Sequence, residues 1–134
     1  MIKWISAALV FSIIISGCTQ KAPEMTIEDY NTTGIQTIYS EGNFIVANVG
    51  FGTPDPCYGL TPSVNRIQNN ITISIDIHST LGPGQGCRQI LWSVGAKIKY
   101  GPLPSGRYNV TVNARYSTSN HPQPKTLGPV QVQI

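Results

Sequence analysis

Three residues with potentially catalytic side chains lie at alternate positions in one short stretch of the chain. In "ITISIDIH", residues 71–78, Ser74, Asp76 and His78 are the residue types of a serine hydrolase triad. On an extended strand, at about 3.3 Å per residue, Ser74 and His78 lie roughly 13 Å apart. A nucleophile and its base must come within hydrogen-bond distance. The spacing therefore excludes this triad and favours a polar, solvent-facing strand surface.

The other chemically active residue types do not combine into a site. His121 lies in the proline-rich stretch "TSNHPQPKT", and the glycine-rich stretches "GFGT" and "GPGQG" lack the Lys-Ser/Thr pair of a phosphate-binding loop. There are two histidines and no C-x-x-C motif to hold a metal. The net charge of +3 comes from scattered basic residues, which argues against nucleic-acid binding. We expect no catalytic residue, no metal and no cofactor, and a protein that is not an enzyme.

The first 18 residues have the features of an export signal. Lys3 precedes an apolar run from Trp4 to Ile15, which is shorter than the roughly 20 residues of a membrane-spanning helix. The tetrad "ISGC", residues 15–18, resembles the lipobox of prokaryotic lipoproteins. The resemblance implies that residues 1–17 are a lipoprotein signal peptide and that Cys18 becomes the lipid-bearing first residue. The mature protein would then be held on the cell membrane, facing outside the cytoplasm.

The two remaining cysteines, Cys57 and Cys87, form an even pair once Cys18 carries lipid. Exported proteins fold in oxidising compartments, where such pairs form disulfides. A hairpin that turns near Asn69 would bring the two cysteines together. The sequence therefore predicts a Cys57–Cys87 disulfide, which a chain-entropy estimate values at roughly 3.5 kcal/mol.

Residues 18–34 have no sustained period and contain proline and charges, so we interpret them as a lipidated N-terminus and flexible tether. Part of this segment is also compatible with a first strand. From residue 35 onward, apolar and polar residues alternate between turn signals, which indicates an all-β domain over residues 35–134. The "ITISIDIH" strand has four isoleucines on one face, and a hairpin turn at Asn69 and Asn70 precedes it. Further strands are expected at Ile35–Ser40, Asn43–Val49, Arg88–Val94, Ala96–Tyr100, Arg107–Tyr116 and Val130–Ile134.

One stretch of twelve residues carries a fold-level resemblance. "LPSGRYNVTVNA", Leu103 to Ala114, is similar to a turn and strand of fibronectin type III and other immunoglobulin-like sandwiches. In those domains a tyrosine, here Tyr108, bonds back to the backbone at the corner. The resemblance implies a small immunoglobulin-like β-sandwich of about seven to eight strands, preceded by a signal peptide helix and a flexible tether.

Three asparagines occupy glycosylation sequons: Asn31, Asn70 and Asn109. Each is a possible attachment site where the source has the modifying enzymes. We expect Asn70 to be the first used, because it lies at a hairpin turn.

These observations favour a lipid-anchored extracytoplasmic module that binds an envelope protein or a glycan. Its partners would be membrane lipid, through acylated Cys18, and an envelope ligand contacted by the loops "GFGTPDP", "TLGPGQG" and "TSNHPQP". The alternative is a small inhibitor of an extracytoplasmic peptidase, which would insert one of these loops into an active-site groove. "NTTG", Asn31 to Gly34, resembles one element of chagasin-like inhibitors, although the proline that follows the first asparagine in that family is missing.

Overall fold

The computed structural model describes residues 20–30, 36–117 and 125–134, and in these residues all regular structure is β-strand. The strands are β1 (Glu24–Asp29), β2 (Thr37–Glu41), β3 (Phe44–Thr53), β4 (Tyr58–Ile67), β5 (Asn70–Ser79), β6 (Trp92–Gly101), β7 (Arg107–Tyr116) and β8 (Lys125–Gln133). The all-β prediction is confirmed. Within the described ranges no helix has the length and apolarity to cross a membrane. The predicted signal peptide and Cys18 lie outside them.

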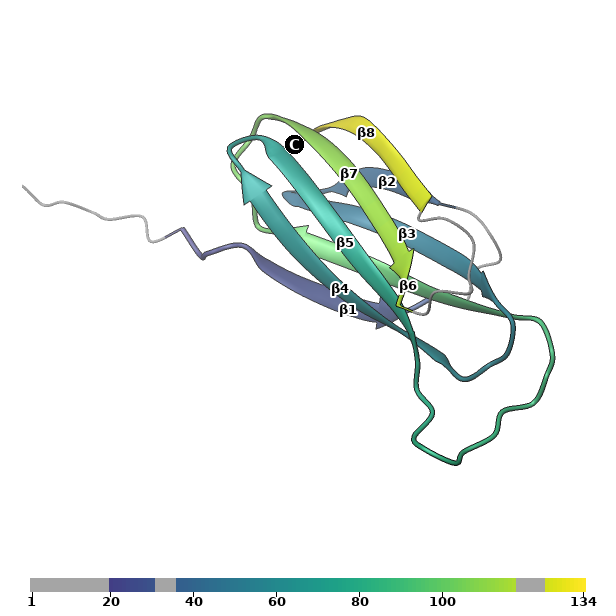
Figure 1. Cartoon of the computed structure of the whole chain (residues 1–134). Helices are drawn as coiled ribbons and strands as arrows, with labels where there is room; N and C mark the ends of the chain where they lie inside the picture. The colour runs from purple at the N-terminus through teal and green to yellow at the C-terminus, as the bar shows by residue number, and fades with distance from the viewer. Residues whose placement is uncertain (1–19, 31–35, 118–124) are drawn as a thin grey trace, which may run out of the picture.

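The strands form two four-stranded sheets that pack face to face (Figure 1). The first sheet has the order β1-β6-β3-β2, and the second has the order β4-β5-β7-β8. Neighbours are antiparallel except β5 and β7, which run parallel because the chain crosses to the first sheet as β6 between them. The β-sandwich prediction is confirmed. The parallel pair distinguishes this sandwich from the two antiparallel sheets of immunoglobulin domains.

The core is built from the alternating inner faces of β3, β5, β6 and β7. The four isoleucines of β5 face inward with relative exposures of 0–1%, as their spacing predicts. The inward-facing residues of β7 are also buried, and its polar residues alternate with them on the outer face. Fully burying an aliphatic side chain contributes about 1.5–3 kcal/mol, so the inner faces supply the main force that holds the sheets together. The most completely buried large side chains are Ile45, Val46, Val49, Ile71, Ile73, Ile75, Ile77, Ile98 and Val110.

The turn before β7 has the tyrosine corner that its sequence indicates. The Tyr108 hydroxyl donates a hydrogen bond of 2.7 Å to the Pro104 carbonyl oxygen, and the ring is 2% exposed. The bond satisfies a hydroxyl that burial would otherwise leave without a partner. This feature of the resemblance to immunoglobulin-like sandwiches is therefore present.

The segment expected to be a tether contains the first strand of the fold. β1 pairs with β6 along its whole length, from Glu24 opposite Gly101 to Asp29 opposite Ala96. β1 is an edge strand, so its side chains stay largely exposed and several of them are charged. The apolar residues Met25 and Ile27 therefore give only a weak two-residue alternation. The prediction of a tether over 18–34 is thus wrong for residues 24–29. The folded domain also begins before residue 35.

Further boundaries differ from those predicted, and β3 continues beyond Val49 to Thr53. Arg88–Val94 and Ala96–Tyr100 were expected as separate strands, but β6 runs unbroken from Trp92 to Gly101. Gly95 does not interrupt it, since it pairs with Gly50 of β3 in regular register. β8 starts before Val130, and its ladder with β7 is restored after a bulge between Val110 and Val112.

The two ends of the sandwich gather different segments. We call the end that holds the first residue of β1, the β4–β5 turn and the β6–β7 turn the base. The opposite end, which we call the tip, holds the β3–β4 loop and the long β5–β6 loop, residues 80–91. In Figure 1, β1 begins at the base, and the β5–β6 loop projects at the other end.

Gly128 lies in the β8 bulge and provides a test of this packing. Its φ is +102°, and an added Cβ would lie 2.6 Å from the Val110 carbonyl oxygen. We expect Gly128→Ala to lower the free energy of unfolding by about 1–3 kcal/mol, from backbone strain and contact with the main chain. The measurement is chemical denaturation, with Gly52→Ala as the control because nothing lies within 4 Å of its added Cβ. Equal stability of the two variants would contradict the close approach.

Candidate binding surface at the tip of the sandwich

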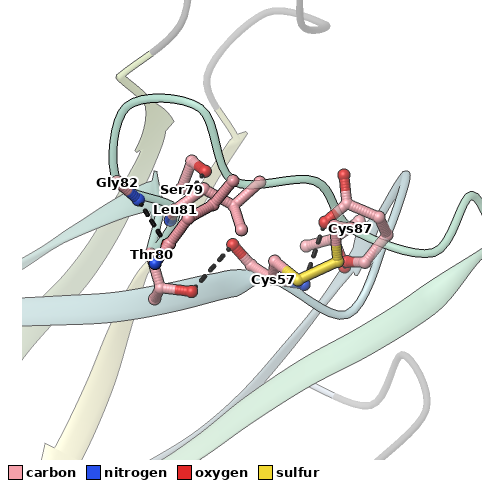
Figure 2. The surroundings of a disulfide bond; sticks show 9 residues. Cys57, Ser79, Thr80, Leu81, Gly82 and Cys87 are labelled. Carbon is pink, nitrogen blue, oxygen red and sulfur yellow. Dashed lines mark hydrogen bonds between the residues drawn. A yellow bond between two sulfur atoms is a disulfide. The ribbon is translucent and has the colours of Figure 1, made fainter.

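A disulfide joins the two loops at the tip. Cys57 and Cys87 are bonded, as Figure 2 shows, and their Cα atoms lie 6.1 Å apart. Cys57 immediately precedes β4, and Cys87 lies in the β5–β6 loop. The predicted pairing is confirmed, and it ties the segment entering the β4–β5 hairpin to the segment leaving it.

Hydrogen bonds around the disulfide fix both loops further. The Cys57 carbonyl oxygen accepts bonds from the Thr80 backbone N–H at 2.8 Å and from its hydroxyl at 3.1 Å (Figure 2). The Cys57 N–H donates to Asp55 Oδ1 at 2.9 Å. The Thr53 hydroxyl donates to the Asp55 carbonyl oxygen at 2.8 Å. The β3–β4 loop and the start of the β5–β6 loop therefore form one connected body.

The β5–β6 loop contains its own turn. The Gly82 N–H donates to Gln85 Oε1 at 2.8 Å, and the Gln85 N–H donates back to the Gly82 carbonyl oxygen at 3.2 Å. Pro83 and Gly84 lie between them, and Gly84 has a φ of +76° that glycine adopts without strain. A long loop rich in glycine is thereby held by local bonds as well as by Cys87.

A hydroxyl of β7 connects the two sheets at the tip. The Tyr116 hydroxyl, from the second sheet, donates to the Gly52 carbonyl oxygen of β3 at 2.8 Å. Partial burial raises the pKa of the Tyr116 hydroxyl above its ordinary value, and nearby Tyr58 raises it further. The neutral, donating form of Tyr116 is therefore the form that the folded protein favours.

Apolar side chains are exposed at this end. Leu91 is 90% exposed, Trp92 53% and Ile90 44%, at the junction of the β5–β6 loop and β6. Trp92 and Tyr30 line one shallow groove of about 300 Å³ beside Val94. We call Tyr30, Ile90, Leu91 and Trp92 the tip patch. Such side chains cost free energy in water, so a cluster of them marks a candidate interaction surface.

The residues predicted to recognise a ligand are partly brought together here. The loops "GFGTPDP" and "TLGPGQG" both lie at the tip. "TSNHPQP", with His121, lies outside the described residues, but Ser117 and Lys125 on either side of it are at the tip end of β7 and β8. Asn31 and the "NTTG" element also lie outside the described residues.

Sequence reasoning missed the tip patch itself. Ile90, Leu91 and Trp92 were assigned to the interior of a strand, whereas the first two lie in the loop. The available signal was three consecutive apolar residues, which do not follow the alternation of a half-buried strand.

Ser74, Asp76 and His78 lie on the outer face of the second sheet, where the alternation predicts a polar surface. Ser74 and Asp76 line a shallow groove on this face. Asp76 Oδ1 lies 3.5 Å from Arg115 Nε of the neighbouring strand, so its charge is compensated across the sheet.

The sequons at Asn70 and Asn109 are neighbours in the fold. The two asparagines pair across the parallel β5 and β7 strands, and Asn109 Nδ2 donates to Asn70 Oδ1 at 3.1 Å. Both are exposed on the outer face of the second sheet at its base. Glycosylation at these positions stays a prediction.

The described residues contain one group of potential metal ligands, at the disulfide. Ligand atoms of Asp55, Cys57 and Cys87 lie within 4.8 Å of one another. Both sulfurs are bonded to each other, and Asp55 Oδ1 already accepts the Cys57 N–H. The group therefore has the character of a fixed loop junction.

The fold and this end of the molecule define a β-sandwich domain whose bridged loops project from one end. By its sequence, the chain belongs to the ORF11 beta-sandwich domain family, which it matches over residues 47–120. The match extends from β3 to the segment after β7, and it includes both cysteines of the disulfide and the β5–β6 loop. Comparison with curated proteins and with solved structures gives no match.

Removing the disulfide tests how far the tip depends on it. Replacing both Cys57 and Cys87 by serine should lower the free energy of unfolding by roughly 3.5 kcal/mol, because the unfolded chain regains the entropy of a loop closed across 30 residues. Chemical denaturation with and without dithiothreitol provides the internal control. Reductant should lower the free energy of unfolding of the wild type to that of the variant and leave that of the variant unchanged. A wild type whose stability is insensitive to complete reduction would contradict this role.

The Tyr116 hydroxyl gives the stability an alkaline dependence. A group whose pKa is raised on folding contributes stability below its unfolded pKa, near 10, and loses it as the pH rises through the folded value. The free energy of unfolding should therefore fall above pH 10, and that of Tyr116→Phe should fall less steeply. At pH 7 the variant should be less stable by about 1 kcal/mol from the lost hydrogen bond. Tyr39→Phe, which removes an exposed hydroxyl, should keep the wild-type slope; identical slopes in all three proteins would contradict the assignment.

Proposed function

We propose that this protein is a lipid-anchored recognition module that stands outside the cytoplasm and binds an envelope protein through the tip patch. Three parts make up the proposal: an anchor at Cys18, a β-sandwich that acts as a rigid support, and a disulfide-fixed tip that carries the contact. Catalysis has no part in it.

The anchor follows from the lipobox-like "ISGC" tetrad. Each buried methylene of an acyl chain contributes about 0.8 kcal/mol, so a diacylglycerol on Cys18 would give lasting attachment where one chain gives only reversible binding. An exported location also agrees with the disulfide, which is a bond typical of oxidising compartments.

The orientation carries the proposal. β1 begins at the base, and residues 20–23 lie beside the base turns, so a protein anchored at Cys18 would present the opposite end, the tip, away from the membrane. That end contains Leu91, Trp92 and Ile90, which are among the most exposed large apolar side chains of the described residues. An anchor and an apolar patch at opposite ends are the arrangement expected of a module that binds a partner above the membrane surface.

The chemistry of the tip patch favours a protein over a glycan. An exposed tryptophan and tyrosine suit either ligand, but Leu91 and Ile90 offer no polar group to a sugar. Residues 80–91 contain a single charged side chain, Arg88. Depletion of charge around aromatic and aliphatic anchors is characteristic of the buried centre of protein interfaces.

A peptidase inhibitor is the second candidate, and one observation favours it. The segment 88–91 follows the bridged Cys87, has no regular structure, and ends on the almost fully exposed Leu91. The Ile90 N–H donates to the Arg88 carbonyl oxygen at 3.0 Å, so the segment is held by a local turn as well as by Cys87. A loop whose shape is fixed before binding loses less entropy when it enters a groove. In this case the envelope partner would be a peptidase.

The test uses a photo-crosslinking amino acid at two exposed positions in intact cells. A probe at Leu91 should capture one defined partner, and the same probe at Ile67, which is 66% exposed at the base, should not. A third probe, at Ile90, should capture the same partner. The double substitution Leu91→Asp with Trp92→Ala should reduce the yield captured by the Ile90 probe at least tenfold. Capture of a peptidase whose activity the purified protein inhibits would favour the second candidate.

Two outcomes would overturn the proposal. Equal capture at Leu91 and Ile67 would show that the tip is not selective. Cys18→Ser protein that is still processed and membrane-bound would remove the anchor.

A further inference from the structure

The position of β1 makes the link between anchor and domain short. β1 starts at Glu24, so only five residues, 19–23, separate it from Cys18. At roughly 3.6 Å per residue the six steps from residue 18 to residue 24 span at most about 22 Å. A flexible chain of this length would average about 12 Å. If Cys18 carries lipid, the base is held within or just above the headgroup layer.

The last residues of this link border a groove in the base. Lys21 and Pro23 line it together with Arg66, Pro102 and Pro104. The groove therefore lies between the segment that leads to the anchor and the turns that close the base. Any molecule that occupies it while the protein is anchored is at the membrane surface.

The side chains around this groove suit a lipid surface. Ile67 is 66% exposed at the end of β4, and the preceding residues Val64 and Arg66 are only partly buried. Beside it, Arg66 is held by a hydrogen bond from its Nε to the Gln68 carbonyl oxygen at 2.8 Å, and its guanidinium carbon lies 5.5 Å from the centre of the Tyr108 ring. Arg107 is exposed at the start of β7. An exposed aliphatic side chain flanked by cations is the pattern of interfacial membrane contacts.

The acidic groups at this end leave those two arginines available. Glu24 lies 3.0 Å from Lys21, and Glu41 lies 3.2 Å from Lys99 and 3.9 Å from Lys97. Among the described residues no carboxylate lies within ion-pair distance of Arg66 or Arg107. Cations near an anionic membrane surface strengthen binding to it.

We propose that the base docks on the membrane, with Ile67 at the boundary of the acyl chains and Arg66 and Arg107 on the phosphates of anionic phospholipids. The inference rests on the proposed anchor at Cys18. It goes further because a docked base would hold the sandwich upright on the bilayer and the tip patch at a fixed height. A domain attached only through a tether would move freely.

The experiment uses the mature acylated protein in vesicles of phosphatidylcholine with 30% phosphatidylglycerol. After removal of residues 1–17 the chain keeps one tryptophan, Trp92, at the tip. A second protein, Ile67→Trp with Trp92→Phe, carries its single tryptophan at the base. Brominated acyl chains should quench the base tryptophan at least twofold and leave Trp92 unchanged.

Charge variants test the role of the arginines. Arg66→Gln with Arg107→Gln should abolish most of the quenching at position 67, and so should vesicles of phosphatidylcholine alone. Lys125→Gln, which removes a cation at the tip end of β8, should leave the quenching unchanged. Thermal unfolding of each variant confirms that it is folded before the comparison.

The outcomes separate the anchor from the docking. Protein that does not float with vesicles, or that lacks acyl groups by mass spectrometry, overturns the anchor. Protein that floats but shows no quenching at position 67 overturns the docking and leaves the anchor intact. Quenching that is the same without phosphatidylglycerol overturns the part played by Arg66 and Arg107, and quenching of Trp92 shows that the tip enters the bilayer instead. Absence of quenching at position 67 together with self-association of the floated protein would assign the surface to a second copy of the chain.

Discussion

The burial of one face of β5 against the first sheet is the constraint on which the rest of the molecule depends. Its four isoleucines have exposures of 0–1%, and β5 is paired on both sides, with β4 and with β7. A shift of register by one residue would turn every isoleucine to the solvent, so the hydrophobic effect fixes the alignment of three strands at once. That alignment places the β5–β6 loop opposite Cys57, and it brings Asn70 beside Asn109. The tip and the base are both consequences of this register.

The alternation of apolar residues was sufficient to predict β5 and β7, because both are central strands with one face buried. It failed for β1, whose Met25 and Ile27 lie at an edge where neither face is fully covered. The disulfide was predictable, since a hairpin brings its two flanks together. For the tip patch the sequence offers only three consecutive apolar residues that break the alternation. The exposure of Leu91 depends on how the β5–β6 loop leaves the sandwich, which that local signal does not specify. The inter-sheet bond from Tyr116 to Gly52 likewise joins residues 64 positions apart.

The parallel pairing of β5 and β7 gives the molecule its polarity. Two strands can run parallel only if the chain returns to the same end between them, and here β6 provides the return in the other sheet. The crossing at the tip is the long β5–β6 loop, and the crossing at the base is the short β6–β7 turn. The long crossing needs a disulfide and several hydrogen bonds to stay ordered, while the short one is closed by the Tyr108 bond to Pro104. Unequal crossings therefore produce one extended end and one compact end.

The edge strands of both sheets have features that disfavour pairing with another chain. Pro62 lies in β4 and Pro129 in β8, the two edge strands of the second sheet, and each removes a backbone donor that a further strand would need. In the first sheet, β2 is only five residues long and β1 carries three acidic residues. These are the devices by which β-proteins resist association through their edges. The protected edges leave the tip as the place where Leu91 and Trp92 are exposed to solvent, and this contrast supports the proposed role of the tip patch in binding.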